Sequence, residues 1–181
     1  MIRILEKQAI RRQARPIDLR TYHWMVENGL VEKQAELIRG VIIEKMSKSP
    51  LHETTVRKLY RRVLAAAAET MLVTKEAPIS IHDSEPQPDI AVIVGNDDDF
   101  AQAHPTTAVL AIEIDREKAA IYAEAAIPEF WLVLALEKTI EVHTTPRGGA
   151  YTECVICRMG DTVQSGVLPA LRVAVAELFP G

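Results

Sequence analysis

Two acidic residues beside neighbouring apolar runs are the first candidates for chemistry in this sequence. Asp89 directly precedes the apolar residues 90–94, and Glu113 closes the apolar run 109–113. A connection rich in Gly, Asn and Asp joins the two runs, so the pattern predicts an antiparallel strand pair.

The register of this pair follows from which side chains can be buried. Pairing Val94 with Ala108 places Asp89 opposite Glu113, on one face of the pair. The other face is then wholly apolar, with Ile90, Val92, Val94, Leu110 and Ile112. Opposed residues have Cβ atoms roughly 4.5–5.5 Å apart, and two carboxylates that close repel unless a cation lies between them. The pair is a candidate divalent-metal site; the alternative is two surface carboxylates at strand ends.

Lys118 favours the metal site over that alternative. It lies in a helix predicted for residues 115–126, directly after the Glu113 strand, so its ammonium group can reach the same end of the sheet. Two carboxylates and a lysine form the working set of a metal-dependent phosphodiesterase. The metal activates water and stabilises charge at phosphorus, while the lysine orients the nucleophile or neutralises developing charge.

The remaining elements must position these residues. Asp18 is expected to cap a helix that ends at Asn28-Gly29, and residues 36–46 are predicted to form a hairpin turning at Arg39-Gly40. Apolar residues recurring near a 3.6 period predict a helix over 51–70. Further strands are predicted at 71–81, 129–136, 139–143 and 151–158, with a final helical turn at 174–179. This order predicts an α+β (α/β) fold, with a mixed β-sheet flanked by helices.

Composition limits the class of protein. The 181 residues suit a single domain, 1–181, of which 1–16 is a candidate basic N-terminal arm. No apolar segment is long enough to span a bilayer, no secretion signal is evident, and two cysteines are too few for a disulfide framework. A cytoplasmic protein is therefore expected. The net charge of −4 argues against non-specific nucleic-acid binding without excluding a nuclease.

Three other groups of residues have a structural reading that we favour. The basic residues Arg57, Lys58, Arg61 and Arg62 could contact phosphates, but a solvated helix face is the simpler interpretation. Cys154 and Cys157 form a Cys-x-x-Cys motif, yet an offset of three in a strand places their thiols on opposite faces. The histidines His23, His82 and His143 are interpreted as structural.

A set of motifs across nearly the whole chain resembles a known family. The motifs are Glu36-Leu37-Ile38 with Gly40 and Met46, His52, Glu85-Pro86-Gln87-Pro88-Asp89, His104-Pro105, Ile112-Glu113, Asp115-Arg116-Glu117-Lys118, Tyr122-Ala123 and Ile127-Pro128-Glu129-Phe130-Trp131-Leu132-Val133. The chain resembles the Uma2 family (DUF820) of restriction-endonuclease-like proteins, within the PD-(D/E)XK nuclease superfamily.

The resemblance implies a restriction-endonuclease-like αβββαβ core. It also implies that Asp89 and Glu113 bind the metal and that Lys118, displaced onto the helix, is the catalytic lysine. Glu36, His52, Gln87 and Asp115 are implied accessory residues.

The sequence departs from the family pattern in two ways. Asp115 stands where the superfamily usually has its lysine, and only Ile114 separates Glu113 from Asp115, where relatives carry a longer loop. Such a short connection is expected to pull the helix start against the strand end and to displace Lys118.

The first functional hypothesis is a Mg²⁺- or Mn²⁺-dependent endonuclease that cuts DNA by means of a metal-activated water. The second is a catalytically degenerate module of the same fold that binds nucleic acid or a protein partner. A third is a structural protein that forms a homodimer through the hairpin 129–143.

Overall fold

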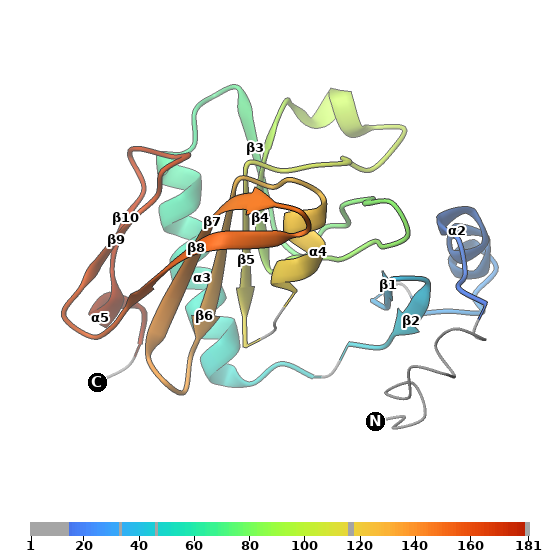
Figure 1. Ribbon diagram of the computed structural model, residues 1–181. Helices are drawn as coiled ribbons and strands as arrows, with labels where there is room; N and C mark the ends of the chain where they lie inside the picture. The colour runs from blue at the N-terminus through green and yellow to red at the C-terminus, as the bar shows by residue number, and fades with distance from the viewer. Residues whose placement is uncertain (1–14, 33, 46, 116–117, 180–181) are drawn as a thin grey trace.

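A six-stranded mixed β-sheet forms the centre of the molecule (Figure 1). The computed structural model describes residues 15–32, 34–45, 47–115 and 118–179. The sheet order is β3-β4-β5-β6-β7-β8; β5 and β6 run parallel, and the other neighbouring strands are antiparallel. These strands are β3 (Met71–Thr74), β4 (Ile90–Val94), β5 (Leu110–Ile114), β6 (Glu129–Leu134), β7 (Thr139–Arg147) and β8 (Ala150–Cys157).

The predicted register of β4 and β5 is confirmed. Ile90 pairs with Ile112, Ala91 with Ala111 and Val92 with Leu110. The same register places Asp89, immediately before β4, level with Glu113 on β5. The alternation of apolar and acidic side chains was therefore sufficient to align these strands.

One face of the sheet is covered by α3 (Pro50–Ala66). Val56, Leu59 and Val63 of this helix are fully buried in one core cluster with Ile90 and Ile112 of the sheet. Each such side chain contributes about 1.5–3 kcal/mol by leaving water. The short elements β9 (Thr162–Gln164), β10 (Arg172–Ala174) and α5 (Val175–Leu178) complete this layer.

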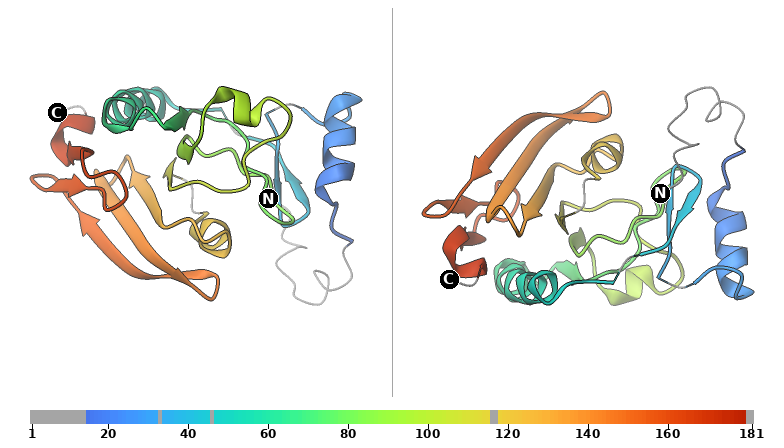
Figure 2. Two further views of the ribbon diagram at one scale, coloured as in Figure 1. Left: turned by 90° about the horizontal axis from the view of Figure 1, so that it is seen from above. Right: turned by 90° about the horizontal axis from the view of Figure 1, so that it is seen from below.

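The opposite face is covered by α4 (Ala119–Glu124), as the two views of Figure 2 show. Ile121 and Tyr122 of α4 pack with Ala91, Ala111 and Phe130 in a second core cluster. The order α3-β3-β4-β5-α4-β6 is the expected αβββαβ core. The backbone edges of β6 and β7 are used by β5 and β8, so the hairpin 129–143 lies inside the sheet.

A two-stranded hairpin, β1 (Glu36–Ile38) and β2 (Val41–Ile43), lies beside the main sheet with α2 (Leu19–Glu27) (Figure 1). Asp18 caps α2 through the backbone N–H of Thr21, and the hairpin turns at Arg39-Gly40, both as predicted. The Glu85 N–H donates to the Leu37 carbonyl at 2.6 Å, which attaches the hairpin to the segment that leads into β4.

Several predicted boundaries were wrong, and three of them have a cause in the backbone conformation. α3 ends at Ala66 rather than residue 70, because Ala67 has an extended ψ of 141° and the chain turns into β3. β3 ends at Thr74 rather than residue 81, because Glu76 has a φ of +53° and leaves the ladder. α4 begins at Ala119 rather than residue 115, because Asp115 has a φ of +57°.

Some predicted features lie outside the described residues. These are positions 1–14 of the basic arm, Met46, Arg116 and Glu117. In the part of the chain that the structure describes, no helix has the length and apolar character needed to cross a membrane.

Candidate active site

Asp89 is a buried carboxylate surrounded by hydrogen-bond donors. Its Oδ1 lies 3.0 Å from Lys48 Nζ, and its Oδ2 lies 3.2 Å from His52 Nε2 and accepts from the Ile114 N–H at 2.9 Å. Burial alone would raise the pKa of Asp89. The His52 and Ile114 hydrogen bonds and the Lys48 charge outweigh burial and hold the pKa well below its usual range. Asp89 is therefore ionised at neutral pH.

Glu113 has the opposite electrostatic character. Its side chain is fully buried, and its Oε1 accepts from Tyr122 Oη at 2.5 Å and lies 3.0 Å from Lys118 Nζ. Burial raises the pKa of Glu113 to about 7, Asp89 and Glu36 add to the rise, and Lys118 and Tyr122 oppose it. The neighbouring acids thus make the charged form of Glu113 costly, and additional positive charge would stabilise it.

Glu36 brings a third carboxylate from outside the main sheet. β1 places the Glu36 Oε1 2.6 Å from Lys118 Nζ and 3.7 Å from Lys45 Nζ. The same oxygen accepts a hydrogen bond from the Gln87 N–H at 2.7 Å. One ammonium group, that of Lys118, therefore contacts both Glu36 and Glu113. The short connection after β5 does not displace Lys118 from the site, contrary to expectation.

These contacts define a charged cluster of carboxylates and ammonium groups, and Lys48 Nζ also lies 2.8 Å from the Glu76 carboxylate at its edge. Its members are Glu36, Asp89 and Glu113 with Lys45, Lys48 and Lys118. Burying charges is costly unless they are paired, and this cluster pairs each carboxylate with at least one lysine. Burial lowers the pKa of Lys45, and the Glu36 carboxylate opposes that effect.

The donor chemistry of the cluster suits a hard divalent cation. Asp89 and Glu113 offer carboxylate oxygens, which Mg²⁺ and Mn²⁺ prefer over nitrogen or sulfur. The two acids lie level on adjacent strands, and Glu113 is a group whose ionisation a cation would favour. The residues present fit such an ion.

The other candidate residues divide into those near the cluster and those elsewhere. His52 contacts Asp89, and the backbone of Gln87 contacts Glu36. Asp115 instead accepts from the Ala135 N–H at 2.8 Å and holds the end of β6.

The basic residues of α3 contact structural partners where the hydrogen bonds are defined. Lys58 Nζ donates to the carbonyls of Glu177 and Leu178, and Arg62 pairs with the Glu177 carboxylate at 2.5 Å. Arg57 and Arg61 are exposed on the same helix. Two of these four basic residues, Lys58 and Arg62, therefore attach α5 to α3.

Sequence reasoning missed Lys45, Lys48 and Tyr122. The two lysines lie in or beside a loop, and Lys48 contacts Asp89, which is 41 residues away in the sequence, while Lys45 contacts Glu36 and the Gln87 carbonyl. Tyr122 follows Lys118 by four positions, the spacing that places two side chains on one helix face. Its place beside Lys118 at Glu113 could therefore have been predicted from the sequence.

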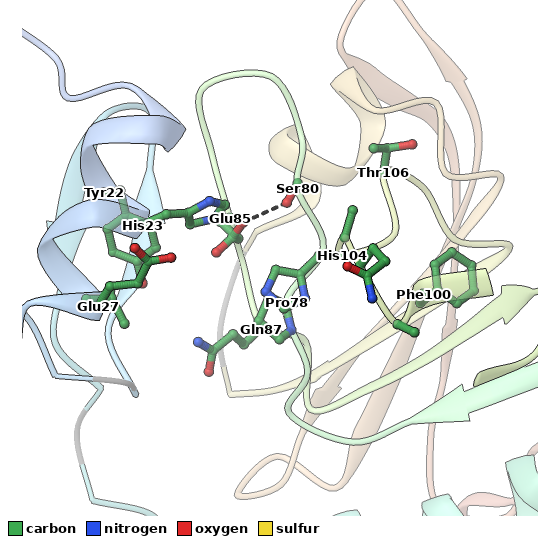
Figure 3. Close-up of a pocket in the computed structure, with 14 residues that line it drawn as sticks. Tyr22, His23, Glu27, Pro78, Ser80, Glu85, Gln87, Phe100, His104 and Thr106 are labelled. Atoms are coloured by element: carbon green, nitrogen blue, oxygen red, sulfur yellow. Dashed lines mark hydrogen bonds and ion pairs between the residues drawn. The ribbon is translucent and has the colours of Figure 1, made fainter. Parts of the chain in front are cut away.

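A cavity of about 610 Å³ lies on the α2 side of the molecule (Figure 3). It lies between α2 and the loops that carry Pro78 and His104, and Gln87 lines it. Its wall includes the buried Glu85 carboxylate, which accepts from Ser80 Oγ at 2.6 Å and lies 2.7 Å from His23 Nε2. Gln87 is the lining residue that also contacts the charged cluster, through its backbone N–H to Glu36.

The αβββαβ order, with acidic residues on adjacent central strands and a lysine at the following helix, defines the restriction-endonuclease-like class of nuclease folds. Comparison with known proteins agrees with this class. The sequence matches the Uma2 family, described as "Putative restriction endonuclease", over residues 30–176. The chain belongs to the Uma2 family, and the resemblance predicted from its motifs is confirmed.

A solved structure has the same fold. It is described as a "putative nuclease belonging to DUF820" from Anabaena variabilis, is 18% identical to this chain, and superposes with a TM-score of 0.71. The alignment covers 91% of this chain and 98% of that one. None of the curated proteins compared matches the chain. Family and fold together support a nuclease.

Proposed function

We propose that this protein is a Mg²⁺- or Mn²⁺-dependent endonuclease that hydrolyses DNA phosphodiester bonds. The observation that carries the proposal is the position of Lys118, whose Nζ lies 3.0 Å from Glu113 and 2.6 Å from Glu36. The family description and the nuclease fold support the same reaction class. DNA is the proposed substrate because restriction endonucleases act on it.

Asp89 and Glu113 are the residues that would hold the ion. When bound there, a divalent cation lowers the pKa of water and stabilises negative charge on a phosphate. His52 and the Ile114 N–H fix the Asp89 carboxylate from one side, so that its orientation is set before any ligand arrives. Such preorganisation avoids a reorganisation cost during the reaction.

Lys118 is proposed to act on the phosphate directly. Its ammonium group is a compact, mobile donor of up to three hydrogen bonds, held at the cluster by two carboxylates. With an ion held by Glu113, the Lys118 ammonium would keep its contact with Glu36 at 2.6 Å and would direct another N–H to a phosphate oxygen. Lys45 and Lys48 add positive charge beside Glu36 and Asp89.

One domain and one cellular compartment are proposed for the activity. The family match covers residues 30–176, which include both the β1–β2 hairpin and the main sheet, so we assign the activity to one catalytic domain. We also propose a cytoplasmic location, in keeping with a DNA substrate and two free cysteines.

Replacing Asp89 by asparagine tests the proposal. Asp89→Asn preserves the side-chain shape but removes the charge, and is expected to lower Mn²⁺-dependent nicking of plasmid DNA by roughly 10²-fold or more. Calorimetric titration should show a matching loss of Mn²⁺ binding. Asp97→Asn, an exposed acid in the 3₁₀ helix Asp97–Phe100, is the control and should keep full activity. Equal cleavage by wild type and Asp89→Asn would refute the assignment.

A second function has one observation in its favour. Lysines already pair with the carboxylates of the charged cluster, as expected of a nuclease-fold module that binds nucleic acid or protein without cleavage. Mn²⁺ titration of the wild-type protein separates the two. A binding module gives no heat at the carboxylates and retains DNA without cutting it.

A further inference from the structure

A second group of potential metal ligands lies on the outer strands of the sheet. Glu141 and His143 are two residues apart on β7, so they share a face, and Cys154 of β8 is the cross-strand partner of His143. The alternation of the strands therefore gathers a carboxylate, an imidazole and a thiol on one surface.

The three ligand atoms are close enough to share one ion. His143 Nε2 lies 3.1 Å from Glu141 Oε2 and 3.9 Å from Cys154 Sγ, and the three atoms all lie within 4.8 Å of one another. Tetrahedral zinc, with bonds of about 2.0–2.3 Å, separates nitrogen from oxygen by roughly 3.3 Å and nitrogen from sulfur by roughly 3.5 Å. Small side-chain movements would reach these values.

We propose that Glu141, His143 and Cys154 form a Zn²⁺ site. Mixed oxygen, nitrogen and sulfur ligands favour this borderline-soft ion and disfavour Mg²⁺. The site is independent of the proposed catalytic ion. Three protein ligands leave a fourth position for water or an added ligand.

The ligands are held by rigid surroundings. Two antiparallel strands carry them, and the His143 ring packs against Phe130 at 5.6 Å and Tyr151 at 5.9 Å between ring centroids. The side chains of His143 and Glu141 are 18% and 25% exposed, and Cys154 is exposed. The ring orientation is therefore constrained, while an ion can still enter from solvent.

The site is close to the charged cluster but separate from it. Glu113 pairs with Leu132, and Leu132 pairs with Glu141, so Glu141 lies two strands from Glu113 in the same row. Two strand spacings correspond to roughly 10 Å, and the Leu132 side chain lies between them. One ion cannot serve both places. Zinc here would tie the edge strand β8 to β7.

Cobalt spectroscopy provides the test, because Co²⁺ occupies zinc sites and gives a near-ultraviolet charge-transfer band when a thiolate is a ligand. Metal-free protein titrated anaerobically with Co²⁺ should develop the band, and one equivalent of Zn²⁺ should remove it. Cys154→Ser should abolish it. His143→Gln should weaken Zn²⁺ binding by roughly 100-fold.

The chain supplies a matched control. Cys154 and Cys157 are its two cysteines, and Cys157 faces the opposite side of the sheet, against the α3 core cluster. Cys157→Ser should keep the band, and so should Asp89→Asn, which removes a ligand of the proposed catalytic ion. No band in the wild-type protein, or an equal band in Cys154→Ser, would overturn the zinc site and leave the nuclease proposal intact.

Discussion

Replacing Glu113 by glutamine is expected to stabilise the fold at alkaline pH while removing activity. Burial and the neighbouring acids raise the pKa of this carboxyl from 4.5 to about 7, so its ionisation opposes folding. The folded state binds the proton more tightly than the unfolded state. Stability is therefore lost as pH rises from about 4.5 to about 7, and the loss is complete above that window.

The size of the effect follows from the pKa difference. At about 1.4 kcal/mol per pKa unit, the rise corresponds to about 3 kcal/mol of stability at most. Glutamine does not ionise, so the variant avoids this loss and keeps an oxygen that can accept from Tyr122 and Lys118. The expected gain in unfolding free energy over wild type is about 1–3 kcal/mol at pH 8, and it shrinks towards pH 5.

Urea unfolding from pH 5 to pH 8, in a chelator, measures this difference. Glu137→Gln, an exposed acid, is the control and should give no pH-dependent change. Added Mn²⁺ should stabilise wild type and not Glu113→Gln, and nicking of plasmid DNA should be lost in the variant. A Glu113→Gln protein that is less stable than wild type by the same amount at pH 5 and pH 8 would refute the electrostatic reasoning.

Three further substitutions test other parts of the structure. Lys118→Met should lower the unfolding free energy by about 3–5 kcal/mol at pH 8, because it leaves two buried carboxylates without this partner. Urea unfolding should show Lys118→Arg losing less, and equal losses would contradict the pairing. Gly40→Ala should cost more than Gly29→Ala by thermal unfolding. Both glycines have a φ near +70°, and placing alanine in this left-handed conformation costs about 1–2 kcal/mol. Only at Gly40 would the added Cβ also clash, because it would lie 2.2 Å from the Pro16 Cβ. Asp115→Ala should lose about 1–2 kcal/mol by denaturant titration, whereas Asp115→Asn, which tolerates the φ of +57° and keeps the acceptor, should change stability and cleavage little.

The sequence was most informative where one face of an element had to be buried. The alternation around Asp89 and Glu113 predicted both the pairing of β4 with β5 and the side chains that share a face. Local signals also predicted the Asp18 cap and the Arg39-Gly40 turn. These features depend on interactions between residues close in the chain or on adjacent strands, so the order and spacing of residue types predict them.

Contacts between distant segments could not be predicted in the same way. Lys48 reaches Asp89 from a loop, and Glu36 reaches Lys118 from a separate hairpin, so neither contact leaves a periodic pattern. Cys154 and Cys157 drew attention as a motif, yet the relevant partner of Cys154 is His143 across the β7–β8 register. That relationship becomes visible only when the two strands are aligned.

Lys118 joins two parts of the molecule through a single ammonium group. Glu36 belongs to the β1–β2 sheet and Glu113 to the main sheet, and one ammonium group contacts both. A ligand that draws Lys118 away from either carboxylate must alter the free energy of the other contact, and thermodynamic linkage makes this influence mutual. A ligand bound at Glu113 would therefore change the strength of the contact that holds the β1–β2 hairpin, although the hairpin contributes no strand to the main sheet.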